Sequence, residues 1–173
     1  LFVGCGESVE NPQTEANNTD NETSNDPLNP STEPAELNKQ VFIDVETFEK
    51  YRKEGALVMD VRDQETYEKN HIPGAVRSSW SDFKAEDREG AFIERDERKL
   101  QEAARELGID RDQKILIYGS APTTLTARQA WSLEYIGHGD VYILDGGISA
   151  WKQNADASLT TEVPEVERGS VKV

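Results

Sequence analysis

The chain has 173 residues, of which 34 are acidic and 19 basic, so its formal net charge is −15 at pH 7. With a mean hydropathy of −0.73 and this acidic balance, it is a poor candidate for binding nucleic acid, because phosphate backbones would repel it. Its length allows one domain of ordinary size with an appendage.

The only cysteine, Cys5, lies near the start of the sequence and can form no intramolecular disulfide. The stretch LFVGCG, with apolar residues and a glycine before Cys5, resembles the lipobox of bacterial lipoproteins. This resemblance implies that residues 1–5 are the end of a lipoprotein signal and that Cys5 carries a lipid anchor. The alternative is an accidental cysteine near a terminus.

Residues 6–38 contain no aromatic residue, few aliphatic ones and many Asn, Thr, Glu, Ser and Pro. Such a composition cannot bury enough apolar surface to offset the entropy lost on ordering, so this segment is predicted to be a disordered acidic tether. A tether between a lipidated cysteine and a folded domain predicts a protein of the bacterial cell envelope, on the periplasmic or extracellular face.

Strand and helix signals alternate along the folded part, which is expected to span residues 39–155. The first half of this part predicts a strand at 41–43, a helix at 45–54 between Asp44 and Gly55, and a second strand at 56–61. A helix from Asp63 to Lys69 and a turn at 71–76 that leads into a short strand follow. The run ALVMDV at 56–61 is typical of a strand buried on both faces of a parallel sheet. Asn70 is expected to end its helix in the left-handed conformation.

The second half begins with a long excursion at 77–95, which Trp80, Phe83 and Phe92 are expected to anchor. It is followed by a helix at 96–107 ended by Gly108, a strand at 114–118 and a loop at 119–124. The remaining elements are a helix at 125–136, a strand at 141–144 and a helical turn at 148–152. The helix at 125–136 is expected to bury Leu125, Ala130, Leu133 and Ile136. Residues 156–173 are expected to form an acidic tail. The alternation predicts an α/β domain with a mainly parallel sheet, in which ligands bind beyond the carboxyl ends of strands.

Two motifs in this part resemble the signatures of the rhodanese family. Residues 60–76, DVRDQETYEKNHIPGAV, are similar to the first signature, and residues 141–151, VYILDGGISAW, are similar to the second. The resemblance implies a three-layer α/β domain with helices on both faces of the sheet. The segments IPGAVRSSWSDF and ARQAWSLEYIGH resemble the thiosulfate and mercaptopyruvate sulfurtransferase branch.

In active members of this family, the strand equivalent to 115–118 ends in a cysteine that carries a persulfide during sulfur transfer. Converging N–H groups and the dipole of the next helix stabilise the thiolate there. Here Gly119 and Ser120 follow the strand, and the folded part contains no cysteine. Counted back from Gly137, the loop is about one residue longer than usual, so either Gly119 or Ser120 occupies the nucleophile position.

A serine nucleophile needs a neighbouring general base. Ser120, His71 and Asp60 could in principle form a catalytic triad, but their spacing in the sequence does not support one. By resemblance, His71 is a structural hydrogen-bonding residue of the HIPG turn. His138 follows the helix end at Gly137 and is expected to be a surface residue that faces the helix dipole.

An anion cradle is the feature of this site that the sequence retains. Its expected members are Gly119, Ser120, Ala121, Pro122, Thr123, Thr124 and Arg128. Amides, hydroxyls and a helix N-terminus suit sulfate, thiosulfate, phosphate or a carboxylate, although Pro122 removes one donor. Arg128 either completes the cradle or, as we favour, pairs with Asp60 or Asp145. Arg62 is expected to form an internal salt bridge that supports the loop.

Three aromatic residues, Trp131, Tyr142 and Trp151, are predicted to lie in the core or at its rim. No ligand cluster has metal spacing, so neither a metal nor a cofactor is predicted. The favoured hypothesis is a membrane-tethered rhodanese-like binding or interaction module without sulfurtransferase activity, whose partner is an unknown protein or a small oxyanion. The alternatives are a sulfurtransferase that works with a partner's cysteine and a hydrolase that uses Ser120.

Overall fold

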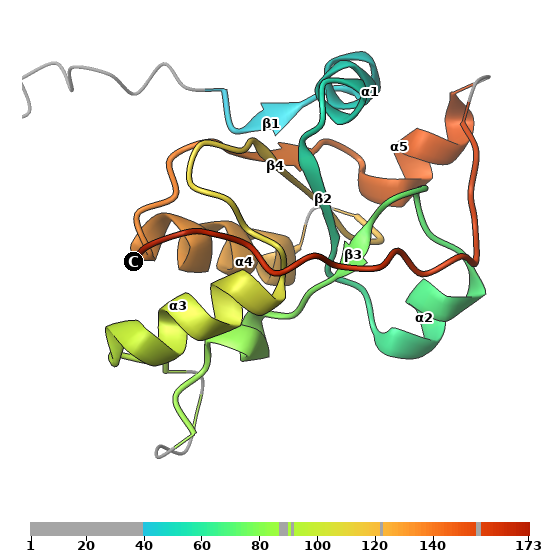
Figure 1. The fold of residues 1–173 in the computed structure, drawn as a ribbon. Helices are drawn as coiled ribbons and strands as arrows, with labels where there is room; N and C mark the ends of the chain where they lie inside the picture. Colours follow the sequence, from blue (N-terminus) through green and yellow to red (C-terminus); the bar gives the residue numbers. More distant parts are fainter. Residues whose placement is uncertain (1–39, 87–89, 91, 122, 155–156) are drawn as a thin grey trace, which may run out of the picture. The chain divides into compact units, whose positions relative to one another are not determined.

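A sheet of parallel strands forms the centre of the domain (Figure 1). The computed structural model describes residues 40–86, 90, 92–121, 123–154 and 157–173; Cys5, the segment 6–38 and Pro122 lie outside the described residues. Within the described part, the strands are Phe42–Ile43 (β1), Leu57–Asp60 (β2), Val76–Arg77 (β3), Ile115–Tyr118 (β4) and Val141–Leu144 (β5). Their order is β1-β5-β4-β2-β3, and every pairing is parallel.

Helices cover both faces of this sheet. They are Val45–Lys53 (α1), Gln64–Lys69 (α2), Glu97–Glu106 (α3), Thr124–Tyr135 (α4) and Gly147–Gln153 (α5), with a 3₁₀ helix at Trp80–Phe83 (η1). The predicted caps of α1 and α2 are confirmed, because Asp44 accepts the N–H of Thr47 at 2.8 Å and Asp63 accepts the N–H of Thr66 at 2.9 Å. The predicted α/β fold is therefore confirmed.

Strand β4 is apolar throughout because both of its faces are covered. Ile115 and Ile117 face a core that they share with α3 and α4, whereas Leu116 and Tyr118 face a core that they share with α1 and α5. In Figure 1, α1 and α5 accordingly lie on one side of the sheet and α3 and α4 on the other. Alternate side chains enter opposite cores, so no position in the strand faces solvent.

Two expectations about local structure are wrong. Asn70 is extended, with φ of −171°, because the next residue, His71, pairs with Thr160 in an antiparallel bridge that needs extended backbone. In the excursion after β3, Phe83 is buried as predicted and Trp80 is half-buried, but Phe92 is 52% exposed and is not a buried anchor.

The buried face of α4 also differs from the prediction. Leu125 is 47% exposed, while Thr126 and Gln129 are buried in its place. The Gln129 side-chain amide donates through Nε2 to the hydroxyl of Ser78 at 2.8 Å, so a polar contact lies inside the domain on this face of α4. A pattern that counts only apolar residues misses such a face.

The predicted acidic tail at 156–173 lies, over residues 157–173, within the folded unit, which extends to Val173. His71 and Thr160 exchange two backbone hydrogen bonds of 2.9 Å. Further along, the Val171 N–H donates to Ile109 O at 3.1 Å, and the Val171 side chain is buried. These contacts use mainly the backbone, so the side-chain pattern gave no sign of them.

No helix in the described ranges is long and apolar enough to cross a membrane.

Candidate functional site

The predicted site is the loop that joins β4 to α4, at the carboxyl ends of the central strands. Gly119 follows β4 directly and is buried, whereas Ser120 and Ala121 are exposed. Thr123 and Thr124 are exposed at the start of α4. The loop therefore lies where ligands of parallel sheets usually bind.

Helix α5 holds this loop through its first residues. The Ile148 N–H donates to Gly119 O at 2.9 Å, and the Ser149 hydroxyl donates to Ser120 O at 3.2 Å. Gly147 has φ of +57°, and a Cβ there would lie 2.5 Å from Gly119 O. The close approach of α5 to the loop therefore requires glycine at this position.

The start of α4 uses one of the loop's donors internally. The Thr123 N–H donates to the Thr126 hydroxyl at 2.8 Å, and that hydroxyl lies 2.7 Å from Thr123 O. Thr126 is almost completely buried. The predicted cradle therefore loses the Thr123 amide as a donor for an anion, in addition to the donor that Pro122 lacks.

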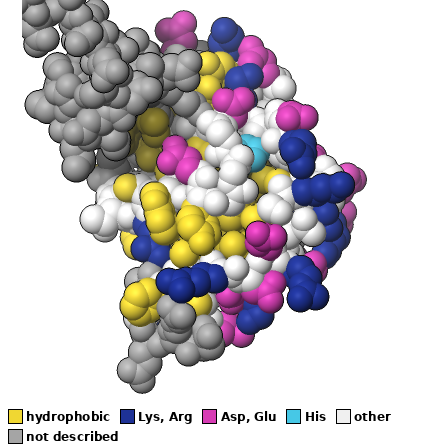
Figure 2. Space-filling view, turned by 90° about the vertical axis from the view of Figure 1, so that its left-hand side faces the viewer, with side chains coloured by type: hydrophobic (Ala, Val, Ile, Leu, Met, Phe, Trp, Pro, Cys, Tyr) yellow, Lys and Arg dark blue, Asp and Glu magenta, His cyan; other side chains and the backbone are white. Residues whose placement is uncertain are grey.

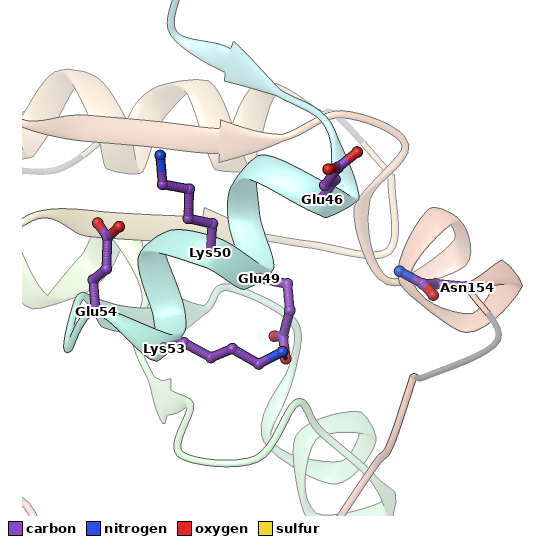
Figure 3. Close-up of a pocket in the computed structure, with 6 residues that line it drawn as sticks. All are labelled: Glu46, Glu49, Lys50, Lys53, Glu54 and Asn154. Carbon is purple, nitrogen blue, oxygen red and sulfur yellow. Dashed lines mark ion pairs between the residues drawn. The ribbon is translucent and has the colours of Figure 1, made fainter.

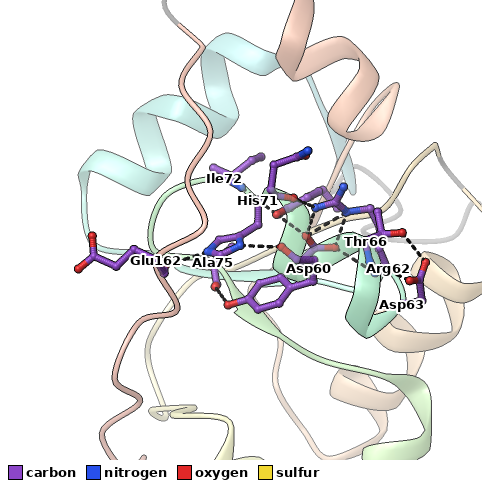
Figure 4. Close-up of polar contacts among 11 residues, drawn as sticks. Asp60, Arg62, Asp63, Thr66, His71, Ile72, Ala75 and Glu162 are labelled. Atoms are coloured by element: carbon purple, nitrogen blue, oxygen red, sulfur yellow. Dashed lines mark hydrogen bonds and ion pairs between the residues drawn. The ribbon is translucent and has the colours of Figure 1, made fainter.

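A buried ionic network supports the strand ends beneath the loop (Figure 4). Nη2 of Arg62 lies 2.6 Å from Oδ2 of Asp60, and Nε lies 2.9 Å from Oδ1, so the contact is bidentate. The same Nη2 donates to Asn70 O at 2.6 Å. Both charged side chains are buried, and the predicted internal salt bridge of Arg62 is confirmed.

Tyr118, the last residue of β4, joins this network to the HIPG turn. Its hydroxyl donates to Oδ2 of Asp60 at 2.6 Å and accepts the Ile72 N–H at 3.0 Å. Burial, together with the neighbouring charge of Asp60, raises the pKa of Tyr118 well above its ordinary value, so the phenol stays protonated. Sequence reasoning missed this role, although a tyrosine directly before the loop was the available signal.

His71 is structural, as predicted, and it is not available as a base. Its Nδ1 lies 2.9 Å from Tyr67 O and its Nε2 lies 2.9 Å from Glu162 O, and the ring is fully buried. Asp60 is engaged by Arg62 and Tyr118. The arrangement of Ser120, His71 and Asp60 as a nucleophile with its base is therefore excluded.

His138 is buried rather than on the surface, so that prediction is wrong. Gly137, with φ of +85°, turns the chain so that the His138 N–H donates to Leu133 O at 3.0 Å. The ring Nε2 lies 2.6 Å from Gln113 O, in the segment before β4. His138 therefore joins the end of α4 to the start of β4, away from the loop.

Arg128 does not pair with Asp60, whose carboxylate is bound by Arg62. Its guanidinium instead lies 4.8 Å from the centre of the Trp131 ring. Trp131 is 45% exposed, and its ring centre lies 5.6 Å from that of Tyr135 in a tilted contact, so it is a surface residue, whereas Trp151 is buried as expected. Figure 2 shows one face of the domain, on which hydrophobic side chains gather among charged ones.

A hollow of about 670 Å³ lies on α1 and contains no residue of the loop (Figure 3). It is lined by Glu46, Glu49, Lys50, Lys53, Glu54 and Asn154. Small-molecule sites are mostly apolar, so this charged surface is not assigned as one. Within the described ranges, no three His, Cys, Asp or Glu side chains are grouped to hold a metal ion.

Comparison with known proteins agrees with this geometry. A model of the rhodanese-like domain family matches residues 33–154. The chain belongs to the rhodanese-like family. The rhodanese signatures identified in the sequence are thereby supported.

Similar curated proteins include the sulfur carrier protein TtuD of Thermus thermophilus, 34% identical over 108 residues, which are 62% of this chain and 36% of that protein. The thiosulfate sulfurtransferase of Corynebacterium glutamicum is 35% identical over 100 residues, 57% of this chain and 32% of that protein. The chain thus spans about a third of the length of these relatives. These similarities support the predicted branch of the family.

Among solved structures, the 3-mercaptopyruvate sulfotransferase SseA of Escherichia coli matches with a TM-score of 0.68 at 24% identity, over 77% of this chain and 55% of that chain. This match shows the rhodanese fold.

Proposed function

We propose that this protein is a rhodanese-like binding or interaction module without sulfurtransferase activity. The observation that carries the proposal is the loop itself: Gly119 follows β4, and residues 6–173 contain no cysteine. Sulfur transfer through a persulfide needs a sulfur nucleophile, and this loop offers only hydroxyl groups.

Gly119, rather than Ser120, is the residue that we place at the nucleophile position. A Cβ on Gly119 would lie 3.2 Å from Cγ2 of Thr126 and 3.4 Å from Cγ2 of Val61, in the space between the end of β2 and the start of α4. Ser120, by contrast, is exposed. A side chain on Gly119 would therefore point into the enclosed part of the loop.

The support of the loop is intact although the nucleophile is missing. The bidentate pair of Asp60 and Arg62 and the contacts of Gly119 with α5 hold the strand ends and the loop in place. A buried ion pair is costly to keep unless further hydrogen bonds support it, and here Asp60 also accepts the hydroxyl of Tyr118 while Arg62 also donates to Asn70 O. The intact support favours a domain that presents a shaped loop to a partner.

Activity measurements separate this proposal from the enzyme hypotheses. We expect purified protein with Cys5→Ala to convert thiosulfate and cyanide to thiocyanate no faster than the buffer. Turnover above that background would overturn the proposal. The alternative, a sulfurtransferase that works with a partner's cysteine, predicts turnover only after a cysteine-bearing partner protein is added.

The module is further proposed to be anchored in the bacterial cell envelope through Cys5, with residues 6–38 as the tether. The sequence LFVGCG and the polar, acidic composition after it support this part. We expect the full-length precursor to incorporate palmitate in a bacterial host and Cys5→Ala to abolish the label. An unlabelled precursor would contradict the anchor.

Capture of a small oxyanion is the second candidate function, favoured by the exposed hydroxyl residues Ser120, Thr123 and Thr124 at the carboxyl end of β4. Calorimetric titration with thiosulfate should then release heat that Arg128→Ala reduces. Heat at the level of buffer dilution would eliminate this function and leave a protein partner as the ligand.

A further inference from the structure

The C-terminal strap, residues 157–173, is fastened to the domain at two separate places. Near its start, Thr160 pairs with His71 through the backbone, and Glu162 O contacts the His71 ring. Near its end, the Gly169 N–H donates to Arg105 O at 2.8 Å and the Val171 N–H donates to Ile109 O at 3.1 Å. Between these two fastenings, residues 161–168 are mainly exposed.

The ring of His71 faces two acceptors at once. Nδ1 and Nε2 each lie 2.9 Å from a backbone carbonyl oxygen, one of Tyr67 in α2 and one of Glu162 in the strap. A carbonyl oxygen only accepts, so both contacts are hydrogen bonds only when both ring nitrogens carry a proton. In the neutral ring, one nitrogen would present a lone pair to a carbonyl oxygen inside a buried site.

From this geometry we propose that His71 is a proton-dependent clasp for the first fastening of the strap. The imidazolium form holds Tyr67 O and Glu162 O together, and loss of one proton removes one of the two bonds. The Tyr67 bond lies within one local segment, four residues apart, whereas the Glu162 bond spans 91 residues. Deprotonation therefore weakens the long-range contact.

Ionisable groups near His71 are neutral or already paired. The Tyr67 ring of α2 stacks on it at 4.1 Å, and burial, followed by the charge of Asp60, raises the pKa of Tyr67, so this phenol stays neutral. Asp60 of β2 is paired with Arg62 (Figure 4). The protonated Tyr118 of β4 also donates to Asp60.

On the strap side of the ring, Glu162 offers its backbone, and its side chain is exposed. Imidazole is the side chain that ordinarily changes charge between pH 5 and 8.

The sign of the pH dependence follows from proton counting. The clasped state binds one proton more than the open state with a neutral ring, so clasping is strongest at low pH. It weakens as the pH rises through the range in which imidazole titrates, by at most about tenfold in the clasping equilibrium for each pH unit.

Nitrogen NMR of the histidine rings in the intact chain tests the proposal directly, with His138 as the internal control. Ring Nε2 of His138 contacts one carbonyl oxygen, Gln113 O, which a neutral ring satisfies. At pH 6 we expect two protonated nitrogens in His71. A neutral His71 ring with a single tautomer at that pH would overturn the proposal.

Amide exchange supplies the second measurement. The Thr160 amide reports the first fastening, and the Val171 amide reports the second, which involves no histidine. We expect the protection of Thr160 relative to Val171 to fall by up to about tenfold per pH unit between pH 6 and pH 8, and His71→Gln to remove this slope. A ratio that stays constant with pH in the wild type would contradict the clasp, and that result needs no folded variant.

Discussion

Replacement of Gly147 by alanine tests whether α5 holds the loop in place. Gly147 has φ of +57°, and a Cβ there would lie 2.5 Å from Gly119 O and 3.1 Å from Cα of Ala121. Both of these contacts are backbone atoms of the loop, so no flexible side chain can move aside. The new methyl group must displace either the loop or the first turn of α5.

Two costs add in this variant. A left-handed residue with a Cβ costs about 1–2 kcal/mol, and overpacking costs about 1–3 kcal/mol more. We therefore expect Gly147→Ala to reduce the free energy of unfolding by about 2–5 kcal/mol. Gly55→Ala is the matched control, because Gly55 has φ of +94° but nothing lies within 4 Å of its Cβ position, so only the first cost applies.

Urea unfolding of the two variants, followed by tryptophan fluorescence, gives both free energies. The difference between them isolates the steric contact of Gly147 with the loop. If Gly147→Ala is no more destabilising than Gly55→Ala, then α5 does not constrain the loop as the structure indicates.

Three further predictions concern the ionic contacts of the domain. Arg62→Ala leaves the buried Asp60 carboxylate without its guanidinium and should cost about 3–5 kcal/mol in urea unfolding; a cost under about 1 kcal/mol would mean that the pair is not buried in solution. Tyr118→Phe removes the hydroxyl that donates to Asp60 and should cost about 1–3 kcal/mol, measured as a lower midpoint of unfolding; an unchanged midpoint would contradict this bond. The hydrogen bond from Arg52 lowers the pKa of Glu49, so the stability that this bond contributes is present at neutral pH and is lost as the pH falls below the usual carboxyl range. Glu49→Gln should therefore make the free energy of unfolding less dependent on pH between pH 7 and pH 3. A pH dependence equal to that of the wild type would refute this role.

The fold could be predicted because its main signals are local. The apolar run of β2 predicted a strand buried on both faces, and Asp44 and Asp63 predicted the starts of two helices. The two signature motifs then fixed the order of the elements and placed the loop after β4. Each of these features is read from a short stretch of neighbouring residues.

The errors concern features that depend on residues far apart in the sequence. The strap binds through backbone groups, for example Thr160 to His71, and backbone contacts leave no side-chain pattern. Asn70 is extended because of that same distant strand partner. His138 is buried because Gln113 O lies where its ring can reach it, 25 residues earlier in the chain.

The candidate site was predicted in its location and only partly in its contacts. Arg62 was expected to form an internal salt bridge, and its bidentate pair with Asp60 confirms this. The role of Tyr118 and the loss of the Thr123 amide to Thr126 depend on hydrogen bonds that sequence spacing does not specify. These two contacts decide how much of the loop remains open to a ligand.

The central claim of the proposal is that the loop keeps its support but lacks a sulfur nucleophile. The most direct test is mass spectrometry after incubation with thiosulfate, on Cys5→Ala protein with and without Gly119→Cys. We expect the protein with Gly119 to gain no sulfur and the protein with Gly119→Cys to gain one sulfur atom, held as a persulfide. Sulfur bound by the Cys5→Ala protein that retains Gly119, or thiocyanate formed by it when cyanide is added as the sulfur acceptor, would contradict the account.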